Sequence, residues 1–126
     1  MNVVDSSAWL EFFADGPNAA EFTEIIKDIP NLRVPTVTVF EVFKRIRTQR
    51  GVEAALYAVA QMRRGEVVDL DADLAVAAAD LSAETGLPLA DSIILATAQS
   101  IEATLWTQDD DFKDFDGVEY RSHRKP

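Results

Sequence analysis

Four carboxylates stand at points of the chain where a folded α/β domain would bring side chains together: Asp5, Glu41, Asp91 and Asp109. Asp5 directly follows the short apolar run 2–4, and Asp109 comes shortly after the run 104–106. Carboxylates without a matching set of histidines or cysteines favour hard cations such as Mg²⁺ or Mn²⁺. A hard cation held by carboxylates indicates phosphate chemistry, provided that the four acids meet in the fold.

The composition predicts one globular domain. The chain has 126 residues, 48% of them hydrophobic, which is enough for a core of its own, and we predict a single domain over residues 1–126. There is no cysteine, which excludes disulfides, thiolate zinc sites and cysteine nucleophiles. The only histidine, His123, lies in a polar tail, so a mechanism built on a histidine base has a poor candidate.

The net charge of −10 argues against a nucleic-acid-binding surface, because phosphate contacts usually come from basic side chains. The basic residues cluster, however, and one cluster consists of Lys44, Arg45, Arg47 and Arg50. A basic rim beside an acidic pocket is compatible with an acidic total. No signal peptide is visible, and no apolar segment approaches the ~20 residues of a membrane span. We therefore expect a soluble, cytoplasmic protein.

Short apolar runs alternate with helical patterns along the chain. The runs predict strands at 2–4, 32–34, 66–69 and 103–106, and 118–120 is the candidate for an edge strand. Apolar spacing and capping residues predict helices at 6–13, 19–29, 37–50, 51–64, 72–85 and 90–101. This alternation predicts an α/β fold, a three-layer α/β/α sandwich with a short parallel sheet of about four to five strands.

Such a sheet would bring the acids together, because ligands bind in the crevice beyond the carboxyl ends of parallel strands. Asp5 and Asp109 both follow strand ends. Asp91 lies near the start of a helix that is apolar nearly all round, where a carboxylate is costly unless it is paired, hydrogen-bonded or metal-bound. Glu41 should face away from the core stripe of its helix, which we predict as Val39, Val42, Phe43 and Ile46.

Each acid also has a simpler interpretation. Asp5 is placed to cap the first helix, Glu41 to be solvated on a helix surface, and one acid of 109–111 to cap the next turn. A capping role suits Asp91 less well, because Pro88 indicates an earlier helix start. Taken singly these interpretations compete with a shared site, but they do not explain why all four acids would face one point.

The four segments that contain the acids are 3–8 (VVDSSA), 38–42 (TVFEV), 89–96 (LADSIILA) and 105–112 (LWTQDDDF). In this order and spacing they resemble the PIN-domain ribonucleases, specifically the VapC-type toxins of toxin–antitoxin pairs. The resemblance runs the length of the chain. Each segment alone is a weak signal, whereas the ordered set is specific.

The resemblance implies a PIN-like fold and a Mg²⁺-dependent endoribonuclease, with Mn²⁺ as an alternative ion. The catalytic quartet would be Asp5, Glu41, Asp91 and Asp109. Asp5, Asp91 and Asp109 would be the metal ligands, and Glu41 would bind the ion or orient the water. The accessory residues would be Ser6, Thr107 and Asp111. We assign contacts with the RNA backbone to Lys44, Arg45, Arg47 and Arg50.

The resemblance also implies partners: an RNA substrate, a cognate VapB-like antitoxin that holds the toxin inactive, a homodimer, and a hetero-oligomer with the antitoxin. Two alternatives remain within the family, a non-toxin PIN nuclease in RNA processing and a catalytically silent PIN-like interaction module. The complete set of four acids favours an enzyme over the silent module. A dehalogenase-type phosphatase is disfavoured, because it needs a second Asp at position 7, where this chain has Ser7.

Overall fold

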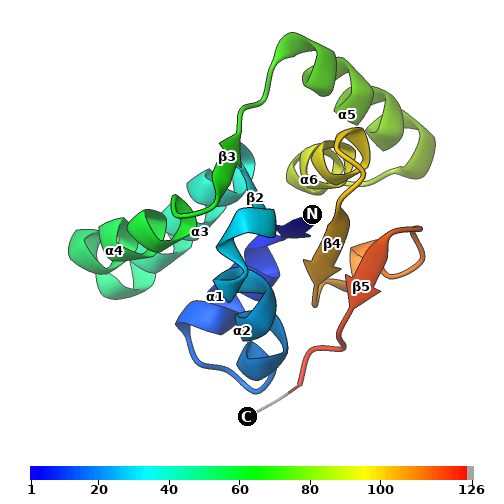
Figure 1. Cartoon of the computed structure of the whole chain (residues 1–126). Coiled ribbons are helices and arrows are strands. Elements are labelled where there is room, and N and C mark those ends of the chain that lie inside the picture. Colours follow the sequence, from blue (N-terminus) through cyan, green and yellow to red (C-terminus); the bar gives the residue numbers. More distant parts are fainter. Residues whose placement is uncertain (125–126) are drawn as a thin grey trace.

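Five strands form the centre of the computed structural model, which describes residues 1–124 (Figure 1). The last two residues of the predicted domain 1–126, Lys125 and Pro126, lie outside the described residues. The strands are β1 (Asn2–Val4), β2 (Leu32–Pro35), β3 (Glu66–Val68), β4 (Thr104–Thr107) and β5 (Val118–Tyr120). The helices are α1 (Ser6–Phe13), α2 (Ala19–Lys27), α3 (Thr36–Arg50), α4 (Val52–Met62), α5 (Ala72–Thr85) and α6 (Leu89–Ser100). The predicted α/β architecture, including the fifth strand at the edge, is confirmed.

The strand order is β3-β2-β1-β4-β5, and every neighbouring pair is parallel. The chain moves outward from β1 through β2 to β3, and then returns to the other side of β1 with β4. The order therefore reverses between β1 and β4, where Val4 lies opposite Trp106. In open α/β sheets a crevice for ligands lies at such a reversal, beyond the carboxyl ends of the strands.

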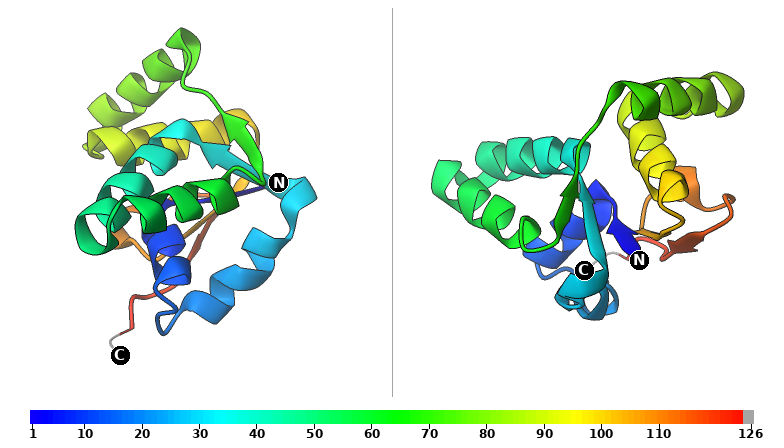
Figure 2. Two further views of the ribbon diagram at one scale, coloured as in Figure 1. Left: turned by 90° about the vertical axis from the view of Figure 1, so that its left-hand side faces the viewer. Right: turned by 45° about the horizontal axis from the view of Figure 1, so that its top comes forward.

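The sheet buries a different core on each face, because successive side chains of a strand point to opposite sides. Val3 and Val4 are both fully buried. Val4 packs into a cluster with residues of α1 to α4, among them Trp9, Phe22, Val42 and Met62. Val3 packs with α6 and β4, among them Ile94, Leu95 and Leu105. Helix α5 packs on α6, outside the layer next to the sheet (Figure 2). Two cores on one sheet give the three predicted layers.

The buried face of α3 differs from the predicted stripe. Thr38, Val42 and Ile46 are buried, whereas Val39 and Phe43 are only half-buried. Burial of the Thr38 hydroxyl is tolerated because the hydroxyl donates a hydrogen bond to the carbonyl of Pro35 at 2.7 Å. The core-facing side of the helix is therefore rotated from the predicted direction, which changes the position of Glu41.

One predicted helix boundary is wrong. The helix predicted at 19–29 ends at Lys27, and Ile29 begins a separate 3₁₀ turn, η1 (Ile29–Asn31). Pro30 has no amide hydrogen for a continued helix and clashes with the preceding turn, so the chain restarts in a tighter turn.

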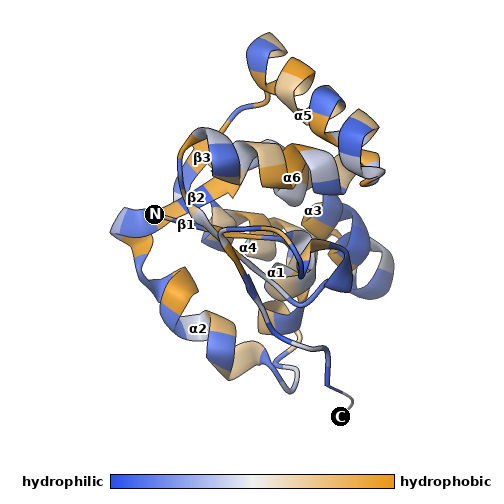
Figure 3. Ribbon diagram, turned by 90° about the vertical axis from the view of Figure 1, so that its right-hand side faces the viewer, coloured by the Kyte–Doolittle hydropathy of each residue, from blue (hydrophilic) through white to orange (hydrophobic). Residues whose placement is uncertain are grey.

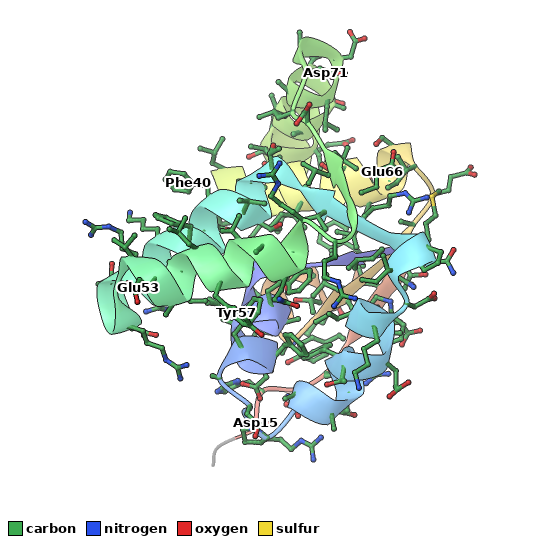
Figure 4. All side chains as sticks on the ribbon, turned by 60° about the vertical axis from the view of Figure 1, so that its left-hand side comes forward. Asp15, Phe40, Glu53, Tyr57, Glu66 and Asp71 are labelled. Carbon is green, nitrogen blue, oxygen red and sulfur yellow. The ribbon has the colours of Figure 1, made fainter. Side chains whose placement is uncertain are left out.

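Several large hydrophobic side chains stay exposed on the outer surfaces of the helices. Phe40 and Tyr57 point away from the sheet on α3 and α4 (Figure 4), and Leu56 is exposed on α4. Val76 and Leu89 are exposed on α5 and α6, where hydrophobic and polar positions alternate along the helices (Figure 3). Within residues 1–124, no helix has both the length and the apolar character needed to cross a bilayer.

Candidate active site

Asp5 is the first residue after β1 and serves as the N-cap of α1. Its Oδ1 accepts a hydrogen bond from the backbone N–H of Ala8 at 3.1 Å and another from the Ser7 hydroxyl at 2.8 Å. The residue is only 2% exposed. Asp5 therefore both caps α1, as one interpretation predicts, and lies where the strand order reverses. The two roles are compatible, because the first turn of a helix presents N–H groups and a positive dipole that stabilise an anion.

Three further carboxylates come together next to this point. Asp91, Asp109 and Asp111 each offer one carboxylate oxygen, and these oxygens lie within 4.8 Å of one another. Asp109 follows β4 and caps the 3₁₀ turn η2 (Asp110–Phe112) by accepting from the N–H of Asp111 at 2.9 Å. Asp91 is the third residue of α6, whose N-cap is Pro88, so it is free of any capping role. Asp111, expected only as an accessory acid, belongs to this closest group.

Burial and crowding disfavour the charged forms of these acids. Burial raises the pKa of Asp5 to about 7, against hydrogen bonds from Ser7, Ala8 and Thr107 that lower it, and the charge of Asp109 raises it further. Burial also raises the pKa of Asp91 to about 7, followed by the charges of Asp109, Asp111 and Asp5. The acids thus influence one another across the reversal point. A cation placed among them would relieve the repulsion that raises these pKa values.

Glu41 of α3 is linked to the start of α1, where Ser6 directly follows Asp5. Its Oε1 accepts a 2.6 Å hydrogen bond from the hydroxyl of Ser6, and the side chain is half-buried. Glu41 lines an open hollow with Lys44 and Arg45, so it does lie outside the buried face of α3, although closer to that face than the predicted stripe implies. The buried face of α3 runs through Thr38, Val42 and Ile46, so position 41 lies at its flank and reaches α1. Ser6, which directly follows Asp5 in the chain, thus holds the Glu41 side chain, and its part in a site stays a prediction.

Hydrogen bonds order the chain just after β4 and connect it to the residues that follow β1. Thr107, the fully buried last residue of β4, accepts from the N–H of Asp109 at 2.9 Å. The Ser7 hydroxyl, which donates to Asp5, also accepts from the N–H of Gln108 at 3.3 Å. The role predicted for Thr107 near the acids agrees with this position. Ser7 is not among the residues predicted for the site, although a serine two residues after a capping aspartate could have indicated this contact.

The four predicted RNA-contacting residues of α3 divide between different surfaces. Arg45 and Arg50 line a hollow of about 350 Å³, here called the α1–α3 hollow, whose other lining residues include Ser7, Glu11, Gln108 and His123. Lys44 and Arg45 line a second hollow together with Glu41. Arg47 lies on the apolar side of the helix with Phe43 and Leu56. Among residues 1–124 none of the four takes part in an ion pair, so their charges are available to a ligand.

The comparison with known families covers nearly the whole chain. The sequence model of the PIN domain matches residues 3–118, a range that contains all four predicted acids. The chain belongs to the PIN domain family. The PIN family is a family of nucleases, and an acidic centre at this position in the fold agrees with that chemistry. No curated protein matches the chain.

Solved structures with the same fold include chains of several toxin–antitoxin systems. A toxin–antitoxin complex from Klebsiella pneumoniae contains a chain of 24% identity and TM-score 0.78, with 94% of this chain and 96% of that chain covered. VapC20 of Mycobacterium tuberculosis, a toxin that cleaves the sarcin-ricin loop, has 19% identity and TM-score 0.76, with 90% and 93% covered. DNA-bound VapBC from Salmonella typhimurium has 17% identity and TM-score 0.74, with 95% and 96% covered. This PIN domain therefore shares the fold of these chains over almost its full length.

Proposed function

We propose that this PIN domain is a metal-dependent endoribonuclease toxin, held inactive by a cognate antitoxin. The observation that carries the proposal is the convergence of Asp5, Asp91, Asp109 and Asp111 at the point where the strand order reverses. The likeness in fold to an RNA-cleaving toxin and to chains of toxin–antitoxin complexes supports it.

The acidic group suits a hard divalent cation. All of its donors are oxygens, as Mg²⁺ and Mn²⁺ prefer. One oxygen from each of Asp91, Asp109 and Asp111 lies within 4.8 Å of the other two, so these three side chains could hold one such ion together. We assign Asp5, Asp91 and Asp109 as metal ligands and Asp111 as an additional one.

When bound, such an ion neutralises phosphate charge and activates a water for in-line attack. The residues of the chain hold the acidic side chains in position. Hydrogen bonds from Ser7 and Ala8 fix the Asp5 carboxylate, and the cap on η2 fixes Asp109. Glu41, held by Ser6, is assigned to orient the attacking water from the side of α3. The exposed cations of that helix, foremost Arg45, are assigned to the phosphates of the RNA.

The partner proposed for the apolar surface of α3 and α4 is an amphipathic segment of the antitoxin. A hollow of about 440 Å³ lies there, lined by apolar side chains that include Phe40, Phe43, Leu56 and Val59 and by the cations Lys44 and Arg47. Apolar grooves of this kind accept helices through regularly spaced anchors. The net charge of −10 suits a partner with a basic segment. We further propose that the protein acts in the cytoplasm and forms a homodimer and a hetero-oligomer with the antitoxin.

Growth of a bacterial host tests the toxin assignment. Induced expression of the chain should arrest growth, whereas the variants Asp91→Asn and Asp109→Asn, at equal levels of soluble protein, should not. Equal arrest by the variants would contradict the proposed site. Metal-dependent cleavage of RNA without growth arrest would instead indicate the alternative, a PIN nuclease of ordinary RNA processing.

A further inference from the structure

The α1–α3 hollow opens directly beside the acidic site. Two of its lining residues are shared with that site: Ser7 donates to Asp5, and Gln108 stands between Thr107 and Asp109. Its volume of about 350 Å³ lies at the lower end of the range of small-molecule sites, about 300–1,000 Å³. A hollow of this size next to the acidic site suits one nucleotide of a single-stranded nucleic acid, not a duplex.

The C-terminal segment 121–124 runs back from β5 towards the loop between α1 and α2, and its His123 forms part of the hollow (Figure 1). Asn18, which is fully buried, fixes this segment. Its Nδ2 donates to the carbonyl of Ser122 at 2.9 Å and to the Gln108 side chain at 3.1 Å. Its Oδ1 accepts from Arg124 at 2.5 Å. The wall of the hollow is therefore built by specific hydrogen bonds rather than by a loose tail.

A buried carboxylate lines the hollow without a cation beside it. Glu11 is 7% exposed, and its Oε2 accepts from the N–H of Asn18 at 2.7 Å. Its Oε1 accepts no hydrogen bond from residues 1–124, and no ion pair reaches the side chain within the same residues. One oxygen of this buried carboxylate thus has no hydrogen-bond partner among the described residues, and such an oxygen beside a hollow is a candidate contact for a ligand's hydrogen-bond donor.

The charges of the hollow orient a ligand. Arg45 and Arg50 line it from α3, Glu11 lines it from α1, and Ser7 and Gln108 connect it to the acidic site. A phosphate would be attracted by the two arginines and repelled by the carboxylate of Glu11. A nucleotide would therefore place its phosphate at the arginines and the edge of its base at Glu11.

We propose that the α1–α3 hollow binds the nucleotide next to the cleaved phosphate, with Arg45 and Arg50 on its phosphate and Glu11 accepting from an amino group of its base. A carboxylate is an acceptor only. Adenine and cytosine offer amino donors at this edge, whereas uracil presents a single ring N–H between two carbonyl groups. The hollow therefore selects amino-bearing bases over uracil. The choice of RNA as the ligand rests on the proposed function.

The test is binding of fluorescein-labelled tetranucleotides A4, C4 and U4 to the full chain in the presence of Ca²⁺, followed by fluorescence anisotropy. One hydrogen bond to a charged group corresponds to about tenfold in affinity, so A4 and C4 should bind about tenfold more tightly than U4. Glu11→Gln keeps an acceptor for Asn18 but can also donate, so it should bring this ratio close to one.

Arg45→Ala supplies an independent readout in the same experiment. Loss of one phosphate contact should lower the slope of log affinity against log salt by about 0.7, the value for single strands. Arg64→Ala, which removes an exposed arginine beyond the end of α4, should leave the slope unchanged.

An unchanged base ratio in Glu11→Gln, or equal slopes in Arg45→Ala and Arg64→Ala, would overturn the inference. RNA that is bound with these preferences but not cut in Mg²⁺ would contradict the proposed function and support the role of the hollow. Cleavage of RNA in Mg²⁺, together with a base preference that Glu11→Gln leaves unchanged, would support the proposed function and contradict the role of the hollow.

Discussion

Replacing Asp5 by Asn should make the metal-free protein more stable at alkaline pH while removing its activity. Asp5 is 2% exposed, and its pKa rises from 3.8 to about 7 in the folded chain. A difference of roughly 3 pKa units corresponds to about 4 kcal/mol of free energy of unfolding. Asn retains an acceptor for the Ala8 N–H and remains a good N-cap, so it removes the charge without removing the cap.

The sign of the pH dependence follows from the direction of the shift. Between about pH 4 and pH 7 the folded protein holds a proton on Asp5 that the unfolded chain has lost. The free energy of unfolding therefore falls as the pH rises through this window, and the full penalty is present above pH 7. The Asn variant has no such proton. Its advantage over the natural chain should be small near pH 4 and should grow to at most about 4 kcal/mol at pH 8.

Urea unfolding in a chelator at pH 5 and pH 8 measures this difference. The matched control is Asp71→Asn, because Asp71 also caps a helix, accepting from the Leu74 N–H at 2.8 Å, but is exposed. The control should change stability by only a few tenths of a kcal/mol at both pH values. The reasoning is refuted if Asp5→Asn is no more stable than the natural chain at pH 8, or if its advantage is the same at pH 5.

Other consequences of the structure can be checked on the purified protein. Mg²⁺ at a hundred times its dissociation constant should stabilise the natural chain by about 2.7 kcal/mol, seen as a higher melting temperature, and Asp91→Asn should lose most of this gain. Gly16→Ala should cost about 1–3 kcal/mol in urea unfolding, because a Cβ there would lie 2.3 Å from Oε1 of Glu11 and would push this buried carboxylate off the N–H of Asn18. Phe22→Ala should cost about 3–5 kcal/mol, because the ring is fully buried in the core beneath α1 to α4. A gain from Mg²⁺ equal in the natural chain and Asp91→Asn, or a urea unfolding curve unchanged by Gly16→Ala or by Phe22→Ala, would contradict these assignments.

The sequence predicts the architecture well because its signals are local and repeated. Most of the short apolar runs are followed by a helical stretch, and this alternation alone implies a parallel sheet with helices on both faces. Asp5 and Asp109 could be placed at the carboxyl ends of two strands from chain order, since Asp5 directly follows β1 and Asp109 lies two residues beyond β4. The strand order itself, with its reversal between β1 and β4, depends on contacts that periodicity does not encode.

The errors arise where a helix phase or a long-range contact decides the position. The buried stripe of α3 is predicted through Val39 and Phe43, because these look more core-like than Thr38, yet Thr38 is buried and satisfies its hydroxyl on a backbone carbonyl. The link from Ser6 to Glu41 spans 35 positions and carries no local signature.

The surroundings of Glu11 were missed for a similar reason. The α1–α3 hollow joins α1, α3, the end of β4 and the C-terminal segment, which are distant in the sequence. Asn18 reaches Gln108 and Ser122 across 90 and 104 positions. No spacing rule brings such residues together, so the hollow becomes visible only in three dimensions.

The most direct measurement is cleavage of single-stranded RNA by the purified full chain in Mg²⁺ or Mn²⁺, beside Asp109→Asn and Asp110→Asn. Asp110 is exposed in the same turn but does not belong to the closest acidic group, so its variant is a matched control. We expect cleavage by the natural chain and by Asp110→Asn, and no cleavage by either in excess chelator. Asp109→Asn should lose at least about a hundredfold in rate, on the order of the effect of removing a key catalytic contact. Full cleavage in chelator, or equal cleavage by Asp109→Asn, would contradict the proposed metal-dependent cleavage.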